Sequence, residues 1–171
     1  MSSDAQDTID AIHAAPANRI GLHEGSIALP VGFEDRSANI FVPADTQTQP
    51  NLSIARDWLA DGETLSAYVD RQLTLLKARL PGHKLVARAG ERLGLEEPAC
   101  LGERIEAHYK NGAQMVRQRQ AAFLIAPRRA LILTAASPRA LDAAFEALWR
   151  GWLDSFSAHA SPSGATPDDV A

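Results

Sequence analysis

Residues 105–126 read IEAHYKNGAQMVRQRQAAFLIA and predict a β-hairpin. Asn111–Gly112 is the clearest turn signal in the chain, because this dipeptide suits the positive φ angles of a type I′ turn. With these two residues as the turn, counting outward pairs Glu106 with Arg117. Their opposite charges support this register.

Two glutamines, Gln118 and Gln120, share one face of the second strand of this hairpin, because strand residues two apart point to the same side. The same register places Ile105 opposite Gln118 and Glu103 opposite Gln120. The remaining side chains of that face are apolar, namely Leu101, Ala107, Val116, Ala122 and Leu124. The other face carries Arg104, Glu106, Arg117, Arg119, Phe123 and Ile125. A pair of amides among apolar neighbours indicates either a solvated sheet face or a binding surface.

A third glutamine lies in line with leucines in the helix predicted for residues 61–82. Asp61 or Thr64 is its N-cap, and Pro81–Gly82 ends it. Apolar residues recur at helical spacing, at Leu65, Val69, Leu73, Leu76 and Leu80. Gln72 forms one ridge with two of these leucines, Leu76 and Leu80, because the three residues are four apart.

A second helix is predicted after Ser137, which would cap it, with Pro138 in its first position. Its core face is expected at Leu141, Phe145, Leu148, Trp152 and Phe156. The other periodic segments predict strands, at residues 19–30, 37–43, 51–59, 83–109 (two strands), 114–126 and 130–137. Since hairpins join most of these strands, we expect an α+β fold, a mainly antiparallel β-sheet packed with two long α-helices.

Composition indicates one soluble domain. The chain has 171 residues, 46% hydrophobic and 22% charged, which is enough to bury a core. Its net charge of -4 argues against a nucleic-acid partner. The single cysteine, Cys100, excludes an internal disulfide and fits a reducing compartment. The N-terminus lacks the basic start and apolar run of a signal peptide, and no segment is apolar for long enough to cross a membrane. We therefore expect a cytoplasmic protein that does not insert into membranes.

The folded unit is expected at residues 19–157. Residues 1–18 are polar and alanine-rich and predict a mobile N-terminal arm, whereas residues 158–171 are small, polar and proline-bearing and predict a disordered tail.

The sequence offers no catalytic, metal or cofactor motif. Its five histidines are scattered, and no pair has the spacing of a metal site. Cys100 lacks a partner motif and is expected to pack as a small apolar residue. The glycines do not form a phosphate-binding loop before a helix. We expect a protein that is not an enzyme and that carries no metal or cofactor.

Three dispersed segments resemble a known family. Residues 23–43 (HEGSIALPVGFEDRSANIFVP), 62–73 (GETLSAYVDRQL) and 117–138 (RQRQAAFLIAPRRALILTAASP) are similar to the DcrB-like branch of the PsbP-like proteins. Within that branch they most resemble the effector-associated (Eag) chaperones of the type VI secretion system. The resemblance implies a cytoplasmic homodimer, a chaperone and adaptor. Such a protein shields the N-terminal transmembrane helices of an effector and helps to load it onto the VgrG spike.

The resemblance also implies an effector-binding surface. The matching positions are Ile40, Leu52, Ser53, Gln72, Leu76, Leu80, Val116 and Gln118 or Gln120. From residue pattern alone, Leu52 and Ser53 point to opposite faces of their strand. Leu76 and Leu80 also fit an ordinary core. The alternative function is a non-catalytic PsbP-like interaction module that binds a soluble protein. The sequence does not identify the effector or the number of helices bound.

Overall fold

The computed structural model describes residues 19–158 and divides the chain into two units, residues 1–37 and 38–171. In the described part of the first unit, β1 (Arg19–Gly21) and β2 (Ser26–Ala28) form an antiparallel hairpin. The backbone N–H of Leu22 donates to the carbonyl of Gly25 at 2.6 Å and closes the turn. The sequence predicts an extended segment with a bend or bulge at Gly25 and Ser26. In the structure the chain reverses its direction before Ser26 and forms two strands instead of one.

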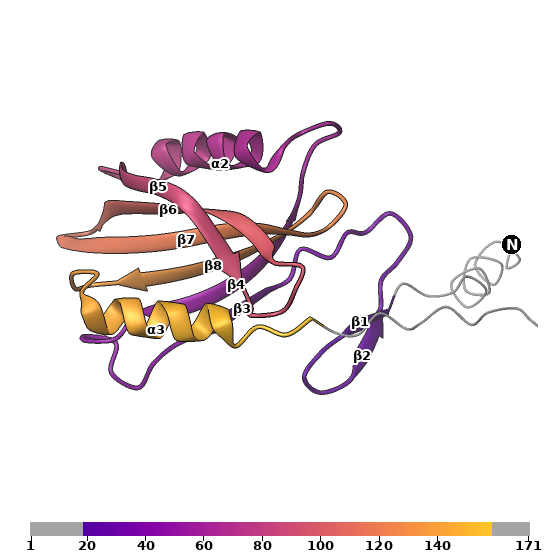
Figure 1. Ribbon diagram of the computed structural model, residues 1–171, viewed down its shortest axis with the longest axis horizontal. Coiled ribbons are helices and arrows are strands. Elements are labelled where there is room, and N and C mark those ends of the chain that lie inside the picture. The colour runs from indigo at the N-terminus through magenta and orange to yellow at the C-terminus, as the bar shows by residue number, and fades with distance from the viewer. Residues whose placement is uncertain (1–18, 159–171) are drawn as a thin grey trace, which may run out of the picture. The chain divides into compact units, whose positions relative to one another are not determined.

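The second unit contains a six-stranded sheet in which every neighbouring pair is antiparallel (Figure 1). The strand order is β3-β4-β8-β7-β6-β5. The strands are β3 (Ala38–Phe41), β4 (Asn51–Trp58), β5 (Lys84–Leu93), β6 (Cys100–Asn111), β7 (Gln114–Ala126) and β8 (Arg129–Ser137). The predicted α+β class with a mainly antiparallel sheet is confirmed.

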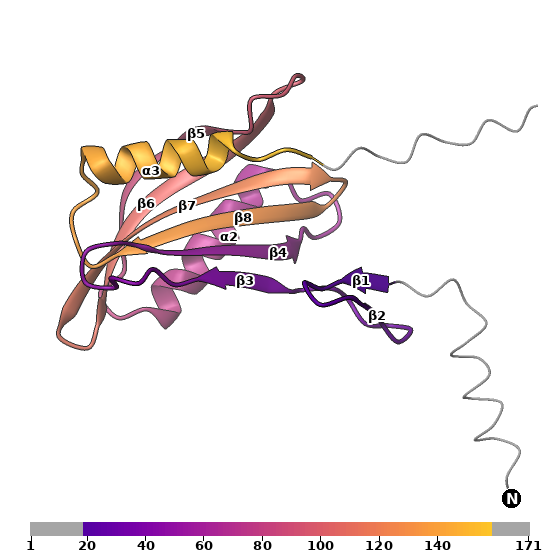
Figure 2. The same ribbon diagram turned by 90° about the horizontal axis from the view of Figure 1, so that it is seen from below.

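The helices α2 (Leu65–Arg79) and α3 (Ala143–Asp154) cover opposite faces of this sheet (Figure 2). The N-cap of α2 is Thr64, one of the two predicted residues, whose hydroxyl accepts a hydrogen bond from the Ala67 N–H at 3.2 Å. The helix ends before Pro81–Gly82, as predicted.

The predicted start of the second helix is wrong. Ser137 is the last residue of β8, and α3 begins after Asp142, whose carboxylate accepts from the Phe145 N–H at 3.0 Å. Ser137 and Pro138 match a cap followed by a first-turn proline, but β8 extends through Ser137 because it pairs with Arg117 of β7. The predicted core face is confirmed in part: Phe145 is buried, and Leu141, Trp152 and Phe156 pack against the same core, whereas Leu148 is 38% exposed. Trp149 and Leu153 complete the buried ridge.

Each face of the sheet has its own core. On the α3 side, buried residues of β5, β7 and β8 pack with the helix, among them Leu93, Phe123, Leu131 and Trp149. On the α2 side, Tyr68 and Val69 pack with Leu59, Ile105, Ala122, Ala130 and Ile132. Sheet residues thus alternate between two helix-covered faces, which explains the long apolar runs of β7 and β8.

The β6–β7 hairpin exists, but its register differs from the prediction by two residues. Asn111 pairs with Gln114, so Gly112 and Ala113 form the turn, and Gly112 has the positive φ of 61°. Glu106 pairs with Arg119 instead of Arg117. A shift of two keeps every side chain on its predicted face, because the strand period is two.

Candidate functional site

The α2 side of the sheet gathers most of the predicted binding residues. The registers place Ile40 of β3 beside Ser53 of β4, Ser53 beside Thr134 of β8, and Thr134 beside Gln120 of β7. The row ends at Ile105 of β6. Residues separated by up to 94 positions in the chain thus form one line across five strands.

Gln118 lies two residues along β7 from this row, on the same face, beside Ala136 of β8 and Ala107 of β6. Only 9% of Gln118 is exposed. Within residues 19–158, neither Gln118 nor Gln120 forms a side-chain hydrogen bond. In the same part of the chain, the buried side-chain polar atom without a partner is Trp58 Nε1, so both amides still reach solvent.

We call the partly open surface beside α2 the amide strip, defined as Ile40, Ser53, Val116, Gln118, Thr134 and Ala136. Ile40 lies at the outer end of the strip and is 71% exposed. The small side chains of Ser53, Thr134 and Ala136 lie between Ile40 and Gln118. Helix α2 packs over β6 and β7. The strip is therefore a shallow surface with an apolar edge and an amide near the helix.

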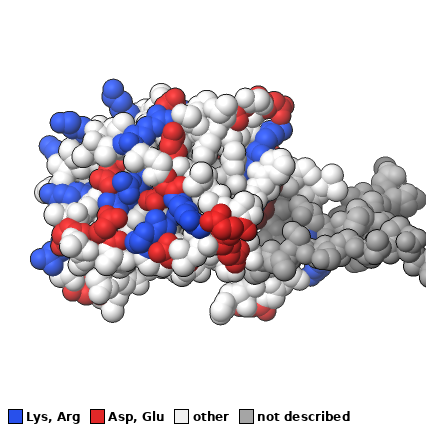
Figure 3. Space-filling view, in the orientation of Figure 1, with Lys and Arg blue, Asp and Glu red and all other residues white. Residues whose placement is uncertain are grey.

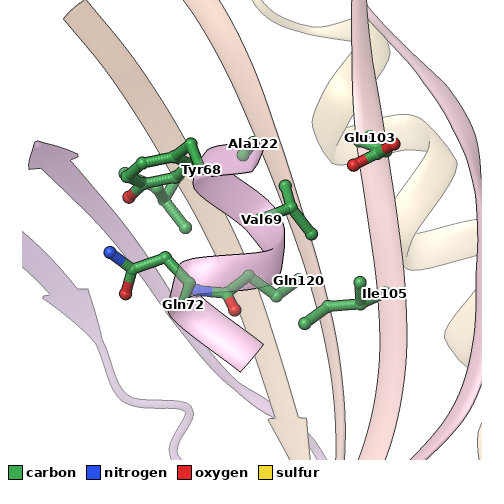
Figure 4. A pocket seen from close by; sticks show the side chains of 8 residues that line it. Tyr68, Val69, Gln72, Glu103, Ile105, Gln120 and Ala122 are labelled. Atoms are coloured by element: carbon green, nitrogen blue, oxygen red, sulfur yellow. The ribbon is translucent and has the colours of Figure 1, made fainter. Parts of the chain in front are cut away.

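Gln72 and Gln120 come together beneath α2 (Figure 4). They line a cavity of about 20 Å³ with Tyr68, Val69, Glu103, Ile105, Ala122 and Ile132. Gln72 donates from Nε2 to a carboxylate oxygen of Asp57 at 3.2 Å, and the Tyr68 hydroxyl donates to the same oxygen at 3.2 Å. A helix is about 10 Å across, so this cavity cannot admit one.

Burial raises the pKa of the Tyr68 phenol, and the neighbouring Asp57 carboxylate raises it further. Tyr68 therefore stays a neutral hydrogen-bond donor, and it holds Asp57 against α2 together with Gln72.

The three leucines of the predicted binding set take different positions. Leu76 packs against the α2-side core, and Leu80 is the half-buried C-cap of the helix. Leu52 lies on the opposite face and packs against the α3-side core. The structure therefore brings Ile40, Ser53, Val116, Gln118 and Gln120 to one side of the sheet and separates Leu52 from them.

Two residues of the strip, Thr134 and Ala136, are absent from the sequence-based set. They belong to the β8 segment, where alternation alone gives their face, but only the pairing of β8 between β4 and β7 places them between Ser53 and Gln118.

Among residues 19–158, no group of three or more acidic, histidine or cysteine side chains is arranged to hold a metal. In the same range, neither helix has the length and apolar character needed to cross a membrane.

Comparison with one solved structure supports the fold. A protein of unknown function from Pseudomonas aeruginosa, PA94, superposes with a TM-score of 0.67 at 23% identity, over 85% of this chain and 99% of that chain. LpqN of Mycobacterium tuberculosis, described as involved in cell envelope biogenesis, gives a TM-score of 0.46 at 16% identity, over 86% of this chain and 94% of that chain. Among curated proteins, none matches the chain significantly.

Comparison with protein families covers most of the chain. The DcrB family model matches residues 24–155, a range that includes the whole sheet, both helices and the amide strip. The protein therefore belongs to the DcrB family.

Proposed function

We propose that this protein is a cytoplasmic chaperone and adaptor that binds the N-terminal transmembrane helices of a type VI secretion effector. It shields those helices before export and helps to load the effector onto the VgrG spike. The proposal rests on the resemblance of residues 23–43, 62–73 and 117–138 to Eag chaperones, and one structural observation carries it. Gln118 is nine-tenths buried, has no side-chain partner within residues 19–158, and lies on the same face as the exposed Ile40, three strands away.

A transmembrane helix in water exposes apolar surface that leads to aggregation, so a protein that holds it must supply apolar contacts. It must also satisfy the small polar groups of such a helix. A glutamine amide suits this task because it both donates and accepts hydrogen bonds. The Gln118 amide still reaches solvent, so a bound client, meaning the effector segment, would replace water as its hydrogen-bond partner.

The shape of the surface favours binding on the amide strip and not beneath α2. The cavity under α2 is about 20 Å³, whereas the strip is partly open. Ser53, Thr134 and Ala136 have small side chains, which allow the backbone of a client helix to approach closely. Ile40 then supplies apolar contact at the outer end, and Gln118 supplies hydrogen bonds at the inner end.

The test is coexpression with the N-terminal hydrophobic fragment of an effector encoded beside the gene, followed by co-purification and a thermal melt. Gln118→Ala is expected to weaken capture by about 1–3 kcal/mol, the cost of leaving a client's polar group unpaired, with little change in melting temperature. Gln114→Ala is the matched control, since Gln114 lies on the same strand and face but is exposed.

Gln120→Ala and Gln72→Ala distinguish the other amides. We expect smaller losses of capture, because Gln120 lines a cavity too small for a helix and Gln72 already bonds Asp57. Undiminished capture by Gln118→Ala would assign that amide to an ordinary sheet face. Failure of the native protein to capture any hydrophobic fragment, with capture of a soluble effector domain instead, would favour the alternative of a PsbP-like interaction module.

A further inference from the structure

Basic side chains gather at one end of the second unit. Lys77, Lys84 and Lys110 are the lysines of the chain. They lie in the last turn of α2, at the start of β5 and beside the β6–β7 turn. The Lys110 N–H donates to the carbonyl of Pro81 at 2.8 Å and so joins the end of α2 to this hairpin. Figure 3 shows Lys and Arg side chains projecting at the corresponding end of the molecule, on the left.

Three basic residues also stand directly opposite one another across the sheet. Lys84 of β5 pairs with His108 of β6, and His108 pairs with Arg117 of β7. We call this set the basic row. Like charges on neighbouring strands destabilise a sheet, and the positive charges of Lys84 and Arg117 lie on either side of His108.

The neighbouring row on the same face shows how the protein neutralises charge elsewhere. Arg119 donates from Nε to Glu106 at 3.0 Å and from Nη1 to Glu146 of α3 at 2.6 Å. Within residues 19–158, by contrast, the basic row forms no ion pair, and Arg117 makes one side-chain hydrogen bond, from Nη1 to the Pro138 carbonyl at 3.4 Å. The contrast lies between adjacent positions of the same strands.

The pKa of the neighbouring His83 indicates a positive potential at this end of the unit. Burial lowers the pKa of His83, and the charges of His108 and Lys77 lower it further. His108 and Lys77 therefore each lie close enough to His83 to disfavour its protonated form.

A pocket of about 250 Å³ opens beside the basic row. His108 and Arg117 line it together with Val86, Ala107, Ala140, Leu141 and Glu106. The Glu106 carboxylate is already engaged by Arg119, so it does not neutralise Arg117. The pocket thus combines unneutralised basic groups with an apolar wall.

We propose that the basic row and this pocket bind an acidic peptide segment of a protein partner. A carboxylate of the segment lies between His108 and Arg117, with Lys84 beside it, and an apolar side chain of the segment enters the pocket against Val86 and Leu141. A ligand with adjacent acidic and apolar groups satisfies both parts of the site, whereas free phosphate would leave the apolar wall unused.

Two other anionic partners fit less well. A membrane surface is too broad to enter a concave pocket, and a nucleic acid needs a continuous basic face, which a chain of net charge -4 does not favour. The site lies on the α3 face, whereas the amide strip lies on the α2 face. The inference therefore goes beyond the proposed function and does not depend on it.

The experiment uses the full chain and a fluorescein-labelled peptide with a Leu-Glu-Leu-Asp core, followed by fluorescence anisotropy at low ionic strength. The double variant Lys84→Gln/Arg117→Gln is expected to lower affinity about tenfold or more, which corresponds to about 1.4 kcal/mol. Arg79→Gln is the matched control, because it removes a charge from the same end without changing the row, and it should lower affinity less than about twofold.

A thermal melt of Lys84→Gln at low salt gives an independent readout. The variant should melt at a higher temperature than the native protein, because one of the two positive charges that flank His108 is gone.

Several outcomes would overturn the proposal. These are absence of peptide binding at millimolar concentration, equal loss of affinity in Arg79→Gln, and equal binding of a peptide in which Gln and Asn replace the acids. Inorganic phosphate or phosphatidylglycerol vesicles that bind as tightly as the peptide would assign the site to a small anion or to a membrane surface instead.

Discussion

At Gly102 of β6, a side chain would occupy space that the neighbouring strand already fills. A Cβ atom there would overlap the carbonyl oxygen of Ala122 and the ring of Phe123, which is fully buried. At Gly90, in the adjacent strand β5, a Cβ atom would meet nothing within 4 Å. The two glycines therefore have different roles although both lie in strands.

We predict that Gly102→Ala lowers the free energy of unfolding by about 3 kcal/mol, because neither the backbone oxygen nor the buried ring can move away freely. Gly90→Ala is the control and should raise stability by about 0.5 kcal/mol, since alanine loses less conformational entropy than glycine on folding. Urea denaturation measures both. Equal effects would contradict the close packing of β6 on β7.

Glu63 provides a pH-dependent contact at the residue scale. Its carboxylate accepts from Arg71 Nε at 2.8 Å and from the Ala60 N–H at 2.8 Å, and these bonds lower its pKa to about 2. The group is ionised in the fold at pH values where it is protonated in the unfolded chain. Its contribution is therefore present above about pH 4.5 and is lost as the pH falls toward about 2.

We predict that Glu63→Gln reduces the loss of stability between pH 4.5 and pH 2. The native protein and the variant should be compared by thermal melts across this range. NMR titration of the Glu63 carboxyl group checks the pKa directly, and a midpoint near 4.5 would contradict the role of Arg71.

At the scale of elements, a buried carboxylate ties α3 to the edge of the sheet. Glu91 of β5 exposes 7% of its side chain and accepts from Trp149 Nε1 at 3.0 Å and from Arg150 Nη1 at 2.8 Å. Burial alone would raise the pKa of Glu91. Hydrogen bonds from Trp149 and the Arg92 N–H, with the charges of Arg104 and Arg150, outweigh burial and lower it.

We predict that Glu91→Leu lowers the free energy of unfolding by about 3 kcal/mol, because the indole N–H of Trp149 and the arginines lose their buried partner. Asp154→Asn is the matched control. Asp154 also pairs with Arg150, at 2.8 Å, but both side chains are about one-third exposed, so the loss should be below about 1 kcal/mol. Trp149 fluorescence during urea unfolding would report the release of α3.

At the scale of the whole molecule, assembly follows from the proposed function. A single small domain offers little surface for apolar helices, so we predict a homodimer. Light scattering at micromolar concentration should give about twice the chain mass of 18.4 kDa. A monomer mass at all concentrations, together with retained client capture, would show that one copy suffices.

The chain ends provide a second test at this scale. Residues 1–18 and 159–171 lie outside the described residues, so the mobile arm and most of the disordered tail stay predictions. Neither segment has a periodic apolar face. We predict that removing residues 1–18 and 158–171 leaves the melting temperature nearly unchanged, and a large decrease would move the domain boundary outward.

Local pattern was sufficient for the α+β class, the extent of α2 and the face on which each hairpin side chain lies. These properties depend on the 3.6-residue and two-residue periods and on nearby stop signals such as Pro81–Gly82. Periodicity also separated Leu52 from Ser53. The family resemblance grouped them in one binding set, and the structure places Leu52 on the other face.

Only the tertiary structure decided which residues are neighbours and which surfaces stay open. The pairing of Glu106 with Arg119 wins because Arg119 also reaches Glu146 of α3, a contact that no local count contains. The helix α3 begins after Asp142 and not after Ser137, because Ser137 still pairs with Arg117 in the sheet. The direction in which a side chain points is a property of its own backbone, whereas its partners depend on strands and helices that are distant in the chain.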